Sequence, residues 1–464
     1  MKNIDLGSPN TLKSIMHLAL PSMLAQLVTV LYSIVDRIFI GNMADVGEIA
    51  LVGVGVVAPI ATFITSFAYW VGFGGAPIFA MYLGEKDETY AKKILSNAFV
   101  MLIILSVILM AFFYALGKPI LYLFGASNES FPYAYEYFLI YLGGTFFSIL
   151  TYGLNQFVIA QGKSILTMFV TLIGAVLNVI LDPIFIYKLN LGVAGAAWAT
   201  VISQFVSFLF VLFLVLKVTN IKLSFNKLDK KIVKRIVKLG FSPFIILVTD
   251  SVIYIALNTC IKAYGGDSAD FYIEVATITQ AFFSLFTGPL LGISTGTQSL
   301  LSFNYGAKNL DLIKKAEKQL IVFAFLFTTF SFVISFFIGT PFAKLFISLS
   351  SSNANSEVIT TTGKVISIYM SGIIPLTFQY VCVDGITALG QAKYSIWLSL
   401  FRKMILLLPL TILLPLFTKN CFNVFYAEPI ADIISSFTSL VVYLILLPKI
   451  LKERENQPID QILE

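Results

Sequence analysis

Two polar residues suited to ion chemistry, Asn178 and Asp182, lie inside a run that is otherwise almost entirely apolar from 165 to 186. A carboxylate at the centre of a bilayer-length helix costs about 2.5–3.5 kcal/mol, so such a residue usually faces a protein interior and has a function. Because the two residues are four apart, both lie on one side of a helix. Pro183 cannot donate a hydrogen bond to the carbonyl of Val179, which leaves that oxygen free near the carboxylate. Carboxylate, amide and carbonyl oxygens suit a proton or a small hard cation.

Two further residues are expected at the same depth in the membrane. With the N-terminus inside, Asp36 and Asp182 come late in outward-running spans, and Thr200 comes early in an inward-running one. At a rise of about 1.5 Å per residue, all three fall in the outer half of the membrane. The sequence therefore predicts one site for a proton or a small hard cation, formed by Asp36, Asn178, Asp182 and Thr200.

A structural alternative exists for each of these residues. Asp36 could pair with Arg37, Asp182 could cap the kink at the following proline, and Asn178 and Thr200 could simply hold helices together. Adjacent residues on a helix diverge by about 100°, so Asp36 and Arg37 do not face the same cavity. Arg37 can instead extend to the outer interface.

The composition is that of a multi-span membrane protein. The chain has 464 residues, of which 58% are hydrophobic and 12% charged, whereas soluble domains carry roughly 25% charged residues. Its three cysteines form no CxxC pair, and its single histidine leaves no plausible serine–histidine arrangement. We also find no nucleotide-binding loop and no HExxH motif, and the lysine-rich tracts are typical of cytoplasmic faces near anionic lipid. We therefore expect neither an enzyme nor a nucleic-acid-binding protein, and no cofactor beyond a coupling ion.

Twelve apolar runs are long enough to cross a membrane, at about 14–40, 48–83, 93–116, 134–160, 164–187, 191–217, 236–264, 272–305, 318–346, 362–389, 394–417 and 424–449. With the N-terminus inside, the inner segments hold 22 of the 31 Lys and Arg residues and the outer segments hold six. Since cytoplasmic loops are enriched in these cations, both termini are predicted to be cytoplasmic, in a multi-pass protein of the plasma membrane.

The two halves of the chain are related by a constant shift. Moving the first half by 222 positions places Pro21 on Pro243, Gly74 on Gly296 and Gly84 on Gly306. Each half has an even number of spans, so the halves are parallel repeats. The predicted fold is an all-α integral membrane protein with twelve helices in two six-helix lobes, 1–226 and 227–464, around a central cavity.

The second half carries its own charges within the membrane. The repeat places Asn258 where the first half has Asp36, so the cation site is predicted in the first lobe only. Asp250 is a second titrating group or a contact for a cationic substrate. Arg402 and Lys403 are expected to neutralise Asp384 or Asp432, because buried charges are usually paired. Glu428 and Asp432 are interpreted as gating or helix-end residues.

Aromatic side chains are candidates for lining a substrate cavity. Tyr32, Tyr137, Tyr141 and Tyr152 could line a cavity for flat cations through cation–π contacts, although ordinary packing is the favoured interpretation for any single one of them.

The chain resembles the multidrug and toxic compound extrusion (MATE) family, bacterial type, over its whole length. The resemblance is carried by these segments: LPS at 20–22 with VDRIFIG at 35–41, LGEKD at 83–87, YGAKN at 305–309, NVILDP at 178–183 with GVAGAAWAT at 192–200, QAK at 391–393, Arg402 and EPIAD at 428–432. The resemblance implies a V-shaped cavity between two lobes and exchange of bulky cationic or amphipathic compounds for Na⁺ or H⁺. It also implies that the positions matching Asp36, Asn178, Asp182 and Thr200 form the cation site. Some members instead use acidic residues of the second lobe.

The resulting hypothesis is a monomeric multidrug antiporter that works by alternating access. Asp36, Asn178, Asp182 and Thr200 bind the cation or proton, while Tyr32, Tyr141, Tyr152 and Asp250 are substrate-cavity candidates. The alternative is a lipid-linked oligosaccharide flippase of the same superfamily, which would need a basic cavity to bind pyrophosphate. A membrane scaffold without transport would not need converging carboxylates. The sequence does not decide between Na⁺ and H⁺, nor whether Asp250, Asp384, Glu428 and Asp432 take part.

Overall fold

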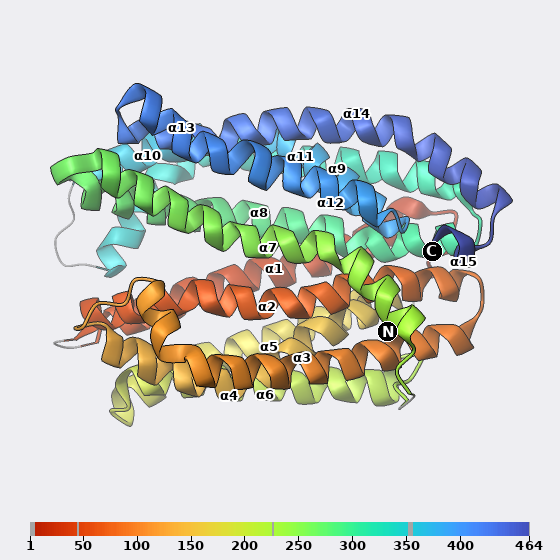
Figure 1. The fold of residues 1–464 in the computed structure, drawn as a ribbon, viewed down its shortest axis with the longest axis horizontal. Helices are drawn as coiled ribbons and strands as arrows, with labels where there is room; N and C mark the ends of the chain where they lie inside the picture. Colours follow the sequence, from red (N-terminus) through yellow and green to blue (C-terminus); the bar gives the residue numbers. More distant parts are fainter. Residues whose placement is uncertain (1–4, 44–45, 225–226, 351–355, 464) are drawn as a thin grey trace.

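Long apolar helices form almost the whole structure, as the length of the apolar runs predicts. The computed structural model describes residues 5–43, 46–224, 227–350 and 356–463. Within these ranges there is no strand, and the helices run side by side along the molecule (Figure 1). The first half contains α1 (Thr11–Gly41), α2 (Gly47–Gly84), α3 (Glu88–Leu123), α4 (Phe131–Ala160), α5 (Ser164–Pro183) and α6 (Gly192–Phe213). The second half contains α7 (Lys230–Gly265), α8 (Ala269–Gly306), α9 (Leu310–Ser350), α10 (Ser356–Met370), α11 (Ile373–Ala388), α12 (Ala392–Leu400), α13 (Leu408–Thr418), α14 (Ala427–Asn456) and α15 (Ile459–Ile462).

These helices make twelve membrane-length spans in the described part of the chain. By length and hydropathy alone, ten continuous helical stretches can cross a membrane, and α10 with α11, bent by 45°, adds an eleventh. One of the ten, Lys230–Gly306, has 77 residues and would be about 115 Å long if straight, far more than a bilayer. Its arms α7 and α8 pack against each other, and the chain reverses at Gly266, whose φ is +52°. This stretch is therefore two spans, which confirms the predicted fold class.

In the described part of the chain three spans contain π-helical turns, which are rare and often found at functional sites. One follows Pro183 and covers Ile184–Lys188, directly after the predicted cation-site residues. A second, Leu214–Val218, ends the sixth span, and a third, Phe401–Leu407, joins α12 to α13.

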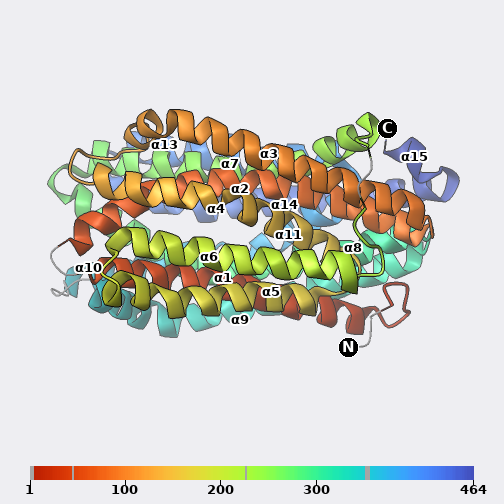
Figure 2. The ribbon, with the colours of Figure 1, turned by 90° about the horizontal axis from the view of Figure 1, so that it is seen from below.

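The two halves form separate layers of helices. Figure 1 shows α1–α6 in one layer and α7–α14 in the other, and both termini lie at one end of the molecule in Figures 1 and 2. The layers meet where α1 packs along α8 and where α2 packs along α7 and α8. The predicted boundary at residue 226 lies outside the described residues.

At the end that carries both termini, the layers are in backbone contact. The last residues of α2 and α8, Gly84 and Gly306, are equivalent in the 222-residue repeat. A Cβ on Gly306 would lie 2.7 Å from the carbonyl carbon of Met81 and closer still to its oxygen, and a Cβ on Gly84 would meet the backbone of Phe303 in the same way. Glycine is required at both positions because only a residue without a side chain permits this approach.

A buried arginine joins the layers at the same place. Arg454 of α14 is 1% exposed and donates to the carbonyl oxygens of Tyr305 (2.9 Å) and Gly306 (2.8 Å). It also forms an ion pair of 2.7 Å with Glu85, which follows α2. The structure is therefore closed at the end that the charge distribution predicts to be cytoplasmic.

Candidate cation site and central cavity

The two acids of the first half lie together. Asp36 on α1 and Asp182 on α5 are both buried, and their carboxyl groups face one another. The packing of α1 along α5 produces this arrangement. Two facing carboxylates repel each other in a buried site unless a proton or a cation lies between them.

Asn178 and Thr200 complete this group. The amide nitrogen of Asn178 donates to Asp182 Oδ1 (3.2 Å) and to the hydroxyl of Thr200 on α6 (3.4 Å). Asp36 Oδ1, Asp182 Oδ2 and Asn178 Oδ1 are shielded from solvent and accept no hydrogen bond within the described structure. Unsatisfied buried oxygens are costly, and a proton or a hard cation would satisfy them. The structure thus brings together all four predicted residues, while their ion binding stays a prediction.

The oxygen ligands of this group favour a monovalent cation over a divalent one. The described residues contain no cluster of three or more His, Cys, Asp or Glu side chains that could hold a metal ion. Two carboxylates with amide and hydroxyl oxygens fit H⁺ or Na⁺ better than a divalent ion.

The π-helical turn after Pro183 holds the outer end of α1 in place. The hydroxyl of Tyr187 in this turn donates to the carbonyl oxygen of Phe39 (2.6 Å), and the two rings pack edge to face. Because Phe39 is one helical turn from Asp36, this contact positions Asp36 opposite Asp182.

Tyr137 lies beside these four residues, although the sequence indicated only a possible cavity-lining role. Its hydroxyl interacts with the side chain of Thr200 and lies near both Asp36 and Asp182. Its ring stacks on that of Tyr141, one turn further along α4. The four-residue spacing of the two tyrosines puts both on one side of α4, but nothing in the sequence placed that side beside the acids.

The predicted substrate tyrosines have different environments. Tyr32 and Tyr152 line a cavity in the first half together with Asn178 and Thr200. Tyr141 is buried beside Thr65 and lines none of the cavities described here.

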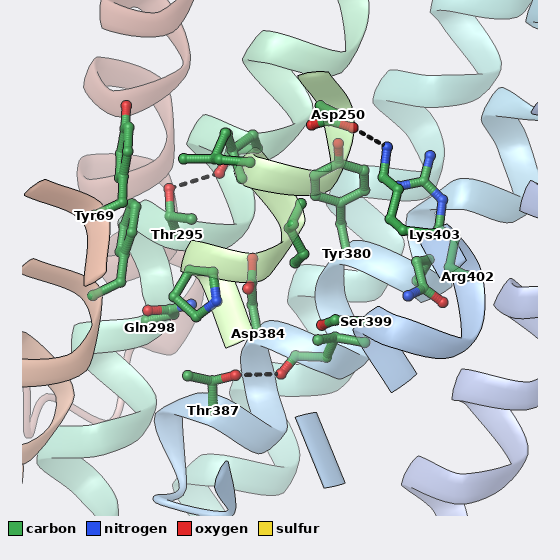
Figure 3. A pocket seen from close by; sticks show the side chains of 17 residues that line it. Tyr69, Asp250, Thr295, Gln298, Tyr380, Asp384, Thr387, Ser399, Arg402 and Lys403 are labelled. Atoms are coloured by element: carbon green, nitrogen blue, oxygen red, sulfur yellow. Dashed lines mark hydrogen bonds and ion pairs between the residues drawn. The ribbon is translucent and has the colours of Figure 1, made fainter. Parts of the chain in front are cut away.

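A second cavity lies between the layers and is shown in Figure 3. Tyr69 and Phe73 of α2 contribute one wall, and α7, α8, α11 and the span α12–α13 contribute the rest. Asp250, one of the substrate-cavity candidates, lines it, and its carboxylate is paired with the Lys403 ammonium group (Figure 3).

The pairing of the other charges agrees with the prediction for Arg402 and corrects it for Lys403, which pairs with Asp250 and not with Asp384 or Asp432. Arg402 binds Asp432 (Nε–Oδ1 2.7 Å) and Glu428 (Nη2–Oε1 3.2 Å), so the expected Asp432 partner is present. Among the described residues Asp384 forms an ion pair with neither cation, and Ser294 donates a hydrogen bond to its carboxylate. Arg402 and Lys403 are adjacent, yet both are buried and both line the cavity. They lie in the π-helical turn, whose wider winding was not predicted from the sequence.

The MatE family model matches this chain twice, over residues 21–184 and 244–413. The chain belongs to the MatE family. The two matches also confirm the internal repeat, because they begin close to the equivalent residues Pro21 and Pro243.

Known relatives of this MatE protein agree with the assignment. It is 25% identical to the multidrug export protein MepA of Staphylococcus haemolyticus over 434 residues, covering 93% of this chain and 92% of the relative. It is 24% identical to MepA of Staphylococcus aureus strain MW2 over 437 residues, covering 93% and 94%.

Solved structures share the fold. An outward-facing multidrug resistance MATE transporter of the MOP superfamily matches with a TM-score of 0.89 at 22% identity, covering 97% of this chain and 99% of that one. A MOP superfamily transporter from Pyrococcus furiosus, described as having a binding pocket of reverse polarity that suggests a different function, matches with a TM-score of 0.88 at 22% identity, with the same coverage. The predicted family and the two-lobe fold are thereby confirmed.

Proposed function

We propose that this MatE protein is a secondary multidrug transporter that exports cationic or amphipathic compounds in exchange for Na⁺ or H⁺. The observation that carries the proposal is the group of Asp36, Asn178, Asp182 and Thr200, in which one buried side-chain oxygen each of Asp36, Asn178 and Asp182 accepts no hydrogen bond within the described structure. The relatives named as multidrug export proteins support the substrate class.

The coupling follows from a difference in affinity between two states. A driving ion can move the protein between an outward-open and an inward-open state only if it binds the two states unequally. Ion entry between Asp36 and Asp182 removes their mutual repulsion and changes the preferred packing of α1 against α5. The substrate, held between the lobes, is released on the outer side.

A flippase for a lipid-linked saccharide is the weaker alternative. Its pyrophosphate would require available cations in the central cavity. The two cations that line this cavity in the described structure, Arg402 and Lys403, are both paired with carboxylates.

The test is dye efflux from everted vesicles with a Na⁺ gradient or a pH gradient imposed separately. The wild-type protein should respond to at least one gradient, and Asp182→Asn should lose that response while reaching the membrane in normal amounts. Asp267→Asn, in the exposed turn between α7 and α8, removes the same charge elsewhere and should behave as wild type. Gradient-driven efflux by Asp182→Asn at the wild-type rate would exclude Asp182 from coupling.

A further inference from the structure

Five ionisable side chains of the second lobe are linked in or beside the central cavity. Asp250, Arg402 and Lys403 line that cavity, Glu428 lines an adjoining one, and Asp432 is buried against Arg402. Arg402 holds Asp432 and Glu428, and Lys403 holds Asp250. All are at least partly buried, and Asp432 is 0% exposed. We call these five residues the cavity charge cluster.

The cavity charge cluster contains three carboxylates but two cations. With every group ionised it lacks one positive charge, which is costly in a medium that solvates charge poorly. In addition, Asp432 Oδ2 is buried and accepts no hydrogen bond in the described structure. One additional monovalent cation would neutralise the cluster.

Asp250 is the carboxylate that an incoming cation can reach. Its side chain is 30% exposed, compared with 14% for Glu428 and none for Asp432. It lines both the cavity of Figure 3 and an adjoining one, and the ring of Tyr380 lines both as well. A carboxylate beside an aromatic face is a suitable site for a flat organic cation.

Lys403 can pair with a second carboxylate, that of Glu428, when a substrate cation binds Asp250. Its ammonium group lies near Glu428 as well as Asp250, and all three residues line the adjoining cavity. The lysine side chain is a flexible stem with a point charge, so it can change partners without movement of the helix. Arg402 is fixed by two carboxylates and by the nearby face of Tyr380, 6.0 Å from its guanidinium carbon.

We propose that Lys403 is a resident cation that sets the charge selectivity of the cavity. A monocationic substrate binds Asp250 and the Lys403 ammonium group moves to Glu428, which leaves the cluster neutral. A dicationic substrate would leave the cluster with a net charge of +1 and therefore binds more weakly than a monocationic one. This inference rests on the proposed function, because it assigns the substrate's contact within that transport cycle.

The test compares two dyes that share one ring system, ethidium with a single positive charge and propidium with two. Binding to the purified protein is followed by dye fluorescence without any ion gradient. Wild type should bind ethidium more tightly than propidium. Lys403→Gln makes the cluster one charge more negative and should shift the propidium-to-ethidium affinity ratio at least about tenfold toward propidium. Asp250→Asn should weaken ethidium binding by about tenfold.

Two controls keep the result specific. Lys364→Gln removes an exposed lysine of α10 and should leave the ratio at its wild-type value. Glu428→Gln deletes the second acceptor of Lys403 and should weaken ethidium binding, so it tests the same idea if Lys403→Gln does not fold.

The proposal would be overturned by wild-type protein that binds neither dye, or by a folded Lys403→Gln whose affinity ratio stays within about twofold of wild type. If Lys403→Gln shifts the propidium-to-ethidium affinity ratio but the wild-type protein shows no gradient-driven efflux, only the proposed function is refuted. If the wild-type protein shows gradient-driven efflux but Lys403→Gln leaves this affinity ratio unchanged, only the role of Lys403 is refuted.

Discussion

Gly306→Ala is expected to open the contact between the two lobes. The new methyl carbon would lie 2.7 Å from the carbonyl carbon of Met81, whereas ordinary contacts begin near 3.4 Å. The ends of α2 and α8 must therefore part by about 1 Å, and overpacking of this kind costs about 1–3 kcal/mol. Because the clash exists only while this end is closed, the cost falls on the closed state. The population should shift toward the open state by roughly 5- to 150-fold.

Spin labels can measure this shift as a distance distribution. Lys92 and Lys314 are exposed, lie near the closed end and are equivalent in the repeat, so labels there report on the separation of the lobes. The background would lack the three buried native cysteines. Gly306→Ala and Gly84→Ala should both populate longer distances. Gly55→Ala, also on α2, places its methyl group where no atom lies within 4 Å and should change nothing. An unchanged distribution in folded Gly306→Ala would refute the reasoning.

Three further predictions concern the other polar contacts. Tyr137→Phe removes a hydroxyl that faces Thr200 and should weaken coupling-ion affinity about fivefold, read as the ion concentration for half-maximal efflux; an unchanged value would show that the hydroxyl does not contribute. Asp432→Asn deprives Arg402 of a buried partner and should lower the free energy of unfolding by about 3 kcal/mol in a denaturant titration, whereas wild-type stability would mean that Glu428 alone suffices. Burial opposes ionisation of Asp460, but hydrogen bonds from Tyr82 and Arg235 outweigh it and lower its pKa below the ordinary 3.8. The ionised Asp460 carboxylate therefore stabilises the folded protein at pH values above 3.8, and this stabilisation is lost as the pH falls through the lower pKa that Asp460 has in the folded state. The Tm values of wild type and Asp460→Asn should differ at pH 7 and converge under acid conditions. A Tm difference that is the same at every pH would contradict this.

The span pattern and the candidate cation site could be predicted from the sequence because they depend on local physics. A helix of about 20 apolar residues satisfies its own backbone hydrogen bonds in a bilayer, so the spans can be recognised one at a time. The four-residue spacing of Asn178 and Asp182 and the cost of a carboxylate in the membrane were enough to indicate a site. The 222-residue repeat was likewise visible as recurring proline and glycine positions.

The pairing of charges in the second lobe was decided only by the tertiary structure. Asp384 and Asp432 looked equally suitable as partners, and only helix packing decided that Arg402 contacts Asp432. Arg402 and Lys403, adjacent in the sequence, both line the cavity from a π-helical turn, which the sequence did not indicate. The lobe contact at Gly84 and Gly306 was also hidden, since a glycine in a sequence does not show which backbone approaches it. A membrane span forms from residues that are neighbours in the sequence, so the spans could be predicted. An ion pair depends on distances of a few ångströms between segments far apart in the sequence, so the ion pairs could not be predicted.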